Sequence, residues 1–392
     1  MSSKIDLNKM GEETKLVHMG RDPDDYHGVV NPPICRTSTI LYDGGLKAYR
    51  DPNTKFRYGR VGTPLSHHFE EAMAALEGGA AAIATSSGLN AISTTFLALT
   101  KSGDHVLIAD HVYPPTRFFA TRVLARMGVE VEFYDPLVGA GIEKLCRDNT
   151  ALIYMESPGS ATMGVQDVPA IAKVAKAKKI LSAIDNTYNA GMLFRPLEHG
   201  VDICIQSCAK YVSGHSDVNL GVIVFTDEAV KKRVKRTSVD LGICPGADDM
   251  YMSLRGLRTL KMRLRHAEEQ ATKVLEYLKT REEIEQLYYP ALPGNDGHEI
   301  WKRDYKGANG IFSILFKDKY SQEDIDRFVD ALSLIPVGSS WGGYESLIQP
   351  QDMKDYRTAN PWKPDGIFIR VQIGNEDTDD LIADLEKGFS VL

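Results

Sequence analysis

Apolar and polar positions alternate along the middle of the chain in a way that predicts strands separated by helices. Short apolar runs that are rich in β-branched residues and end at small polar residues predict buried strands. These runs lie at residues 105–110, 151–155, 179–184 and 201–205, and a strand of small residues begins at residue 80 and leads into a helix toward residue 99. Strands that alternate with helices over residues 80–226 predict an α/β fold with a mostly parallel sheet and helices on both faces.

The two ends of the chain carry different patterns. Residues 1–60 have little periodicity, and two consecutive prolines favour extended backbone there, so we expect an N-terminal arm. The patterns further on predict a long helix at residues 255–278, strands at 310–316 and 367–373, and a helix at 377–389. A chain of 392 residues exceeds one ordinary core. The predicted division is an arm at 1–60, a large domain at 61–255 and a smaller C-terminal α+β domain at 256–392.

Composition and charge restrict the classes of function. The formal net charge is −7, so no excess of Lys and Arg is available for a dedicated nucleic-acid surface. The five cysteines form no Cys-x-x-Cys pair, which favours free thiols over a zinc site or a disulfide, and no metal is expected. The sequence contains neither a long apolar span nor the apolar core of a signal peptide. We expect a cytoplasmic protein that binds neither nucleic acid nor a membrane.

Two predicted strands end in side chains suited to one cofactor. Lys210 follows the strand at 201–205 in a loop of small polar residues, where an amine is placed to attack a carbonyl group. A surface lysine on a serine-rich loop explains this stretch better when it is taken alone. Asp185 ends the strand at 179–184, so a carboxylate and an amine meet at the ligand-binding edge of the sheet. Pyridoxal phosphate (PLP) needs this pair, since a lysine holds its aldehyde and a carboxylate keeps its ring nitrogen protonated.

Several motifs extend this correspondence in order, from about Thr14 to the C-terminus. They are Glu156-Ser157-Pro158-Gly159-Ser160, Asp185-Asn186-Thr187, Ser207-x-x-Lys210-Tyr211-x-x-Gly214-His215-Ser216-Asp217, Pro290-Ala291-Leu292-Pro293-Gly294 and Ser340-Trp341-Gly342-Gly343-Tyr344-Glu345-Ser346. On these motifs the chain resembles the Cys/Met-metabolism branch of the fold type I PLP enzymes. Motifs that recur together are far more specific than any one of them. The resemblance implies a PLP-dependent transferase-like α/β fold and PLP as the cofactor.

The resemblance also implies where the cofactor is bound. A strand runs into a helix at Ser86-Ser87-Gly88, and a helix N-terminus binds phosphate, although this tripeptide is also an ordinary helix cap. In the family the phosphate is held by the residues equivalent to Ser87, Gly88, Leu89 and Ser207. The resemblance implies that Tyr113 stacks on the pyridine ring and joins Lys210 in catalysis, while a tyrosine that packs its own loop is the alternative.

The resemblance further implies an active unit of more than one chain. The family's Tyr-x-Arg motif, here Tyr58 and Arg60, reaches the cofactor phosphate of the neighbouring subunit, and Tyr58 is also expected to contact the substrate. A dianionic phosphate suits a charge-assisted contact from Arg60. We therefore expect a homodimer with shared sites, assembled in the family into a tetramer.

Arg370 interrupts an otherwise apolar predicted strand, where an arginine seldom lies without a partner. The family places an arginine here to bind the substrate α-carboxylate bidentately, assisted by Ser340 and Trp341; a structural ion pair is the alternative. The resemblance implies a carbon–sulfur β-lyase that cleaves L-cystathionine, a small sulfur-containing amino acid, to homocysteine, pyruvate and ammonia. The alternatives are a γ-lyase or γ-synthase of the same branch and a non-catalytic ligand-binding relative.

Two positions depart from the family pattern. Ala209 stands beside the lysine where many relatives carry threonine, and losing one charge-assisted hydrogen bond to phosphate costs about 1.5–3 kcal/mol unless another donor replaces it. Ser339 stands where similar β-lyases carry tyrosine, so we expect a different pocket for the distal part of the substrate. Pocket shape rather than residue type decides between cystathionine, cystine and related thioethers.

Overall fold

The central element of the computed structural model, which describes residues 6–353 and 356–392, is a seven-stranded sheet. Its strands are β1 (Ala81–Thr85), β2 (His105–Ala109), β3 (Glu130–Tyr134), β4 (Thr150–Glu156), β5 (Leu181–Asp185), β6 (Ile203–Ser207) and β7 (Gly221–Phe225). They lie in the order β1-β7-β6-β5-β4-β2-β3. All pairings from β6 to β3 are parallel, and β7 pairs antiparallel with both β1 and β6. The predicted α/β fold with a mostly parallel sheet is confirmed.

Helices connect these strands and cover the sheet. The α-helices up to the last of these strands are α1 (Glu12–His18), α2 (Gly45–Arg50), α3 (Pro64–Glu77), α4 (Gly88–Leu99), α5 (Pro114–Phe119) and α6 (Val168–Lys178). The 3-10 and π segments are η2 (Leu7–Lys9), η3 (Pro23–Tyr26), η4 (Ala120–Leu124), η5 (Ala125–Met127), η6 (Pro136–Leu145) and η7 (Pro196–His199). α4 packs against β6 and β7, and α6 packs against β5. α6 begins at Val168 because Asp167 caps its first turn and Pro169 follows at its second position.

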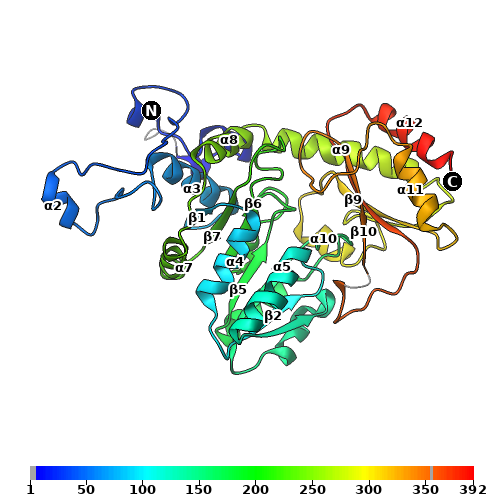
Figure 1. Cartoon of the computed structure of the whole chain (residues 1–392), viewed down its shortest axis with the longest axis horizontal. Coiled ribbons are helices and arrows are strands. Elements are labelled where there is room, and N and C mark those ends of the chain that lie inside the picture. Colours follow the sequence, from blue (N-terminus) through cyan, green and yellow to red (C-terminus); the bar gives the residue numbers. More distant parts are fainter. Residues whose placement is uncertain (1–5, 354–355) are drawn as a thin grey trace.

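The N-terminal arm extends away from the rest of the molecule at α2, as Figure 1 shows. Its apolar side chains are not covered within the chain, since Leu41, Leu46 and Tyr49 are 88%, 67% and 56% exposed. An exposed apolar surface of this kind is typical of a segment that packs on another protein surface.

A second sheet forms the C-terminal part. Its strands are β8 (Ile284–Tyr288), β9 (Ile311–Phe316), β10 (Leu347–Gln351) and β11 (Phe368–Gln372), all paired antiparallel in the order β10-β11-β9-β8. The helices after β7 are α7 (Glu228–Asp240), α8 (Ala247–Leu257), α9 (Leu260–Leu278), α10 (His298–Asp304), α11 (Gln322–Asp330) and α12 (Thr378–Phe389). α9 bridges the two sheets in Figure 1. Its first turns join the core of the large sheet through Leu260 and Leu264, and its last turns join the second core through Val274 and Leu278.

The single long helix predicted at residues 255–278 is wrong, because α8 ends at Leu257 and α9 begins at Leu260. Thr259 between them has ψ of 6°, outside the helical range. Long-range contacts override the local helical pattern here. Gly256 packs against the Lys210 loop so closely that a Cβ would lie 2.3 Å from the carbonyl oxygen of Val212, and Arg258 donates to the carbonyl of Met19 at 2.8 Å. The division at residue 256 stays a prediction.

Candidate active site

A cavity of about 190 Å³ lies at the carboxyl ends of β4, β5 and β6. Most of the predicted site residues line it together, although they come from distant parts of the chain. They are Ser87, Gly88, Leu89, Tyr113, Asp185, Ser207, Lys210, Trp341 and Arg370. The cavity therefore lies where parallel α/β sheets bind their ligands.

Lys210 follows the end of β6, which extends two residues beyond the predicted strand, to Ser207. Its Nζ donates to Ser340 Oγ at 2.8 Å and lies 5.6 Å from the centre of the Trp341 ring. Burial, with repulsion from the nearby Arg370, lowers the pKa of the lysine to about 8, while the charge of Asp185 acts in the opposite direction. The amine therefore loses its proton more readily than that of an ordinary lysine.

Asp185 is buried beside Lys210, at the end of the neighbouring strand β5. Its Oδ1 accepts from the backbone N–H of Thr187 at 3.0 Å and from the Thr187 hydroxyl at 2.5 Å. Burial raises the pKa of this carboxyl, and the Thr187 hydrogen bonds and the charge of Lys210 oppose the rise. The Thr187 hydroxyl also accepts from the backbone N–H of Ser207 at 2.9 Å, so one threonine joins the ends of β5 and β6. The quoted motif contains Thr187, but sequence reasoning assigned it no contact.

The junction of β1 and α4 fits a phosphate. Gly88 and Leu89 are the first two residues of α4, so their backbone N–H groups have no partner earlier in the helix. Ser87 caps the helix through its hydroxyl, which accepts from Asn90 N–H at 3.1 Å. The backbone at Gly88 approaches Ser207 so closely that a Cβ would lie 2.6 Å from the Ser207 Cβ. Free N–H groups and a nearby hydroxyl are the donors that a phosphate needs, and the residues present therefore fit PLP.

Tyr113 precedes α5 and lines the same cavity, with 43% of its side chain exposed. Its backbone N–H donates to Glu156 Oε2 at 2.6 Å, while Ser160 Oγ donates to Glu156 Oε1 at 2.7 Å. Burial raises the Tyr113 pKa, and the negative charges of Asp185 and Glu156 raise it further, so the phenol stays protonated.

Sequence reasoning missed the role of Glu156. It stands directly beside Asp185 in the β4–β5 pairing and is buried. Burial and then the charge of Asp185 raise its pKa to about 8. The negative charge of Asp185 on the adjacent strand end disfavours ionisation of Glu156, so Glu156 keeps its proton while Asp185 is ionised. The only local signal was that Glu156 ends its strand just as Asp185 does.

Arg370 lies on β11, opposite Gln349 of β10. It donates to the carbonyl of Ser340 at 3.1 Å and to Gln349 Oε1 at 2.5 Å, and among the described residues no carboxylate forms an ion pair with it. Burial lowers its pKa to about 10. A buried guanidinium without a carboxylate is costly unless an anionic ligand completes the site. Gln349 also donates to Ser339 Oγ at 3.1 Å. Ser339, which stands where similar β-lyases carry tyrosine, is therefore linked to the Arg370 guanidinium through Gln349.

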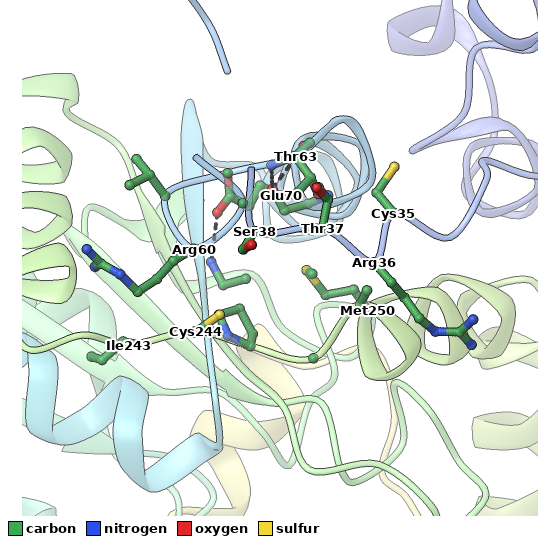
Figure 2. Close-up of a pocket in the computed structure, with 18 of the residues that line it drawn as sticks. Cys35, Arg36, Thr37, Ser38, Arg60, Thr63, Glu70, Ile243, Cys244 and Met250 are labelled. Carbon is green, nitrogen blue, oxygen red and sulfur yellow. Dashed lines mark hydrogen bonds between the residues drawn. The ribbon is translucent and has the colours of Figure 1, made fainter. Parts of the chain in front are cut away.

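Tyr58 and Arg60 do not reach Lys210 of the same chain. Arg60 donates from Nη1 to the carbonyl of Val239 at 2.8 Å. It lines a separate cavity of about 480 Å³ with Glu70, Arg36 and Cys244 (Figure 2). Tyr58 is 44% exposed.

The cysteines, potential metal ligands and helix hydropathy complete the description. Cys204 and Cys208 are buried and all five cysteines are free. The part of the chain that the structure describes contains no group of three or more potential metal ligands and no helix with the length and hydropathy of a membrane span.

The sheet topology, together with a lysine and an aspartate that share one cavity with a phosphate-binding helix start, defines a fold type I PLP enzyme. The model of the family described as Cys/Met metabolism PLP-dependent enzyme matches residues 13–390, and the chain belongs to this family. Its cofactor is therefore PLP.

Three relatives show how the chain compares with known proteins. It is 39% identical over 388 residues to cystathionine beta-lyase MetC of Escherichia coli strain K12, covering 96% of this chain and 98% of the relative. It is 38% identical over 397 residues to the L-alanine/L-glutamate racemase of Wolbachia pipientis wMel, covering 98% of both chains. The crystal structure of cystathionine gamma-lyase from Lactobacillus plantarum complexed with L-serine aligns with a TM-score of 0.88 at 31% identity, covering 97% of this chain and 99% of that one.

Proposed function

We propose that the enzyme is a carbon–sulfur β-lyase that cleaves L-cystathionine, with water, into homocysteine, pyruvate and ammonia. The observation that carries this proposal is that Lys210 and Arg370 line the same cavity. One cavity holds an amine whose pKa burial lowers to about 8 and an arginine without a carboxylate partner among the described residues. Such a pair suits an amino acid whose carboxylate is gripped while its Cα proton is removed. The 39% identical lyase of E. coli supports this choice of reaction.

Binding in this proposal is divided between two ends of the cavity. Ser87, Gly88, Leu89 and Ser207 would hold the phosphate, and Asp185 would keep the proton on the ring nitrogen. Tyr113, whose backbone N–H is fixed by its hydrogen bond to Glu156, would stack on the ring. Arg370 binds the substrate α-carboxylate, and the Ser340–Trp341 segment closes the same end of the site.

Lys210 moves the proton. When bound, PLP takes up the electron pair left at Cα, which no protein side chain can do. The neutral Lys210 amine removes the Cα proton, and the hydrogen bond from Nζ to Ser340 Oγ aims the amine toward the Arg370 end of the cavity. Ionised Asp185 would hold the proton on the ring nitrogen, and once Cα has lost its proton the bond between Cβ and sulfur breaks, the electron pair leaving on sulfur, which takes up a proton and departs as homocysteine.

The proposal includes a homodimer whose sites are shared. The support is the exposed apolar arm and the placement of Arg60 in a different cavity from Lys210. Mixing two inactive variants, Lys210→Ala and Arg60→Ala, tests this sharing. Random reassociation of dimers restores about a quarter of the sites if Arg60 acts on the neighbouring chain, because half the dimers are mixed and each contains one intact site. No recovery after mixing would show that Arg60 acts within its own chain or not at all.

Lys210→Ala tests the lyase assignment itself. We expect no pyruvate from L-cystathionine, an unchanged circular dichroism spectrum and full activity in the control Lys173→Ala, which alters an exposed lysine of α6. Near-normal turnover by the Lys210 variant would overturn the assignment.

Racemisation of free amino acids is the second candidate, because a relative of almost equal identity is a racemase. It requires proton transfer on both sides of Cα, and Tyr113 lines the cavity together with Lys210. Chiral chromatography of L-alanine and L-glutamate after incubation with the enzyme distinguishes it. Accumulation of the D-isomers faster than pyruvate forms from L-cystathionine would favour this reaction.

A further inference from the structure

A second cavity of about 350 Å³ continues from the catalytic one. Lys210, Tyr113, Trp341 and Arg370 line both, so the two cavities share the catalytic end. The second cavity is also lined by Arg357, which neither the family motifs nor the roles assigned above include. A substrate bound at Arg370 therefore has a continuous path for its distal half toward a second arginine.

The backbone that carries Arg357 is held in place by Asp110. This buried carboxylate accepts from the backbone N–H groups of Thr358, Ala359 and Asn360 at 2.9 to 3.1 Å. It also pairs with Arg117 of α5. The Thr358 hydroxyl donates to it as well, at 3.1 Å, so five donors fill the hydrogen-bonding capacity of the two Asp110 oxygens. Asp110 thus anchors the loop without forming an ion pair with Arg357.

Arg357 keeps donors available. Its Nη2 donates to Thr162 Oγ1 at 2.6 Å, and no carboxylate of the described residues lies within 4.0 Å of its guanidinium. Burial lowers its pKa and Arg117 repels it, while Asp110 and Asp296 attract it from a longer distance. A guanidinium has five N–H donors, so Arg357 can still donate two hydrogen bonds to one carboxylate.

The walls between the two arginines suit a thioether chain. Phe118 of α5 packs against Tyr356 with ring centres 6.0 Å apart, and both line the second cavity beside Trp341. Apolar side chains in this position favour methylene groups over water. The lining of the second cavity therefore combines two arginines and apolar rings with two carboxylates, Asp110, which is hydrogen-bonded to the loop, and Asp352.

We propose that Arg357 binds a second carboxylate, the one on the leaving half of the substrate, and so selects sulfur amino acids that carry an acid at both ends. This inference rests on the proposed lyase function and defines its substrate class. It predicts that removing the negative charge at the distal end lowers the value of kcat/KM.

The test compares two substrates that differ only in this charge, S-(3-carboxypropyl)-L-cysteine and its primary amide. Both release pyruvate if the enzyme is a β-lyase. The wild-type holoenzyme should prefer the acid by about tenfold to a hundredfold in kcat/KM, as expected for one charge-assisted contact. Arg357→Met should lose this factor for the acid and change the amide at most about threefold, so that the preference disappears.

Controls separate the possible outcomes. Arg126→Met, at an exposed arginine outside both cavities, should keep the full preference. Equal losses for acid and amide in Arg357→Met would overturn the inference, because Arg357 would then only support the fold. If that variant does not fold, the wild-type comparison decides alone, and an absent preference refutes the inference. No pyruvate from either substrate with the wild type would instead refute the lyase function.

Discussion

Replacing Arg370 by methionine separates a binding role from a structural one. The guanidinium is buried, it forms hydrogen bonds with Ser340 and Gln349, and no described carboxylate pairs with it. A charge-assisted contact with the substrate is worth about 1.5–3 kcal/mol, which corresponds to a loss of about tenfold to 150-fold in kcat/KM. The loss should appear mainly in KM if the contact is equally strong in the ground and transition states.

The same substitution should cost little stability. Burial lowers the Arg370 pKa from 12.5 to about 10, so the fold disfavours the charged side chain on the order of 3 kcal/mol. Methionine removes that cost together with two hydrogen bonds, and these changes offset each other. Steady-state kinetics with L-cystathionine and urea unfolding of the same preparation measure both effects. An unchanged KM together with a stability loss of several kcal/mol would refute the reasoning and make Arg370 a structural residue.

Two further predictions concern the cofactor end. Gly88→Ala should weaken PLP affinity at least tenfold, because a Cβ would lie 2.6 Å from the Ser207 Cβ. Fluorescence titration of the cofactor-free protein with PLP measures this affinity. An unchanged affinity would contradict the placement of the phosphate at the junction of β1 and α4. Lys210→Met should remove a pH dependence of cofactor-free stability. Below pH 8 the lysine is charged in both states, whereas between its folded pKa of about 8 and the ordinary 10.5 only the unfolded state keeps the proton. The wild-type unfolding free energy should therefore rise by about 1.4 kcal/mol per pH unit there, and an equal rise in the variant would contradict this.

Local patterns predicted the parts of the fold that depend on nearest neighbours. The alternation of apolar runs and amphipathic stretches placed Asp185 and Lys210 at the same sheet edge, and β5 and β6 do pair in parallel. The cap at Ser87 was also visible, since a serine before a helix is a local signal.

The remaining features depend on contacts between distant residues. Glu156 becomes a partner of Asp185 only through the register of β4 on β5, which no single stretch of sequence specifies. Gln349 meets Arg370 only because β10 pairs with β11. The break before α9 follows from the packing of Gly256 on the Lys210 loop, while the local helical pattern continues through it.

The most direct test of the central claim is to incubate the PLP-loaded enzyme with L-cystathionine and identify the keto acid and thiol by mass spectrometry. Cleavage between Cβ and sulfur gives pyruvate and homocysteine, as the account predicts. Release of 2-oxobutyrate and cysteine would contradict it, because the bond broken would then be the one between Cγ and sulfur.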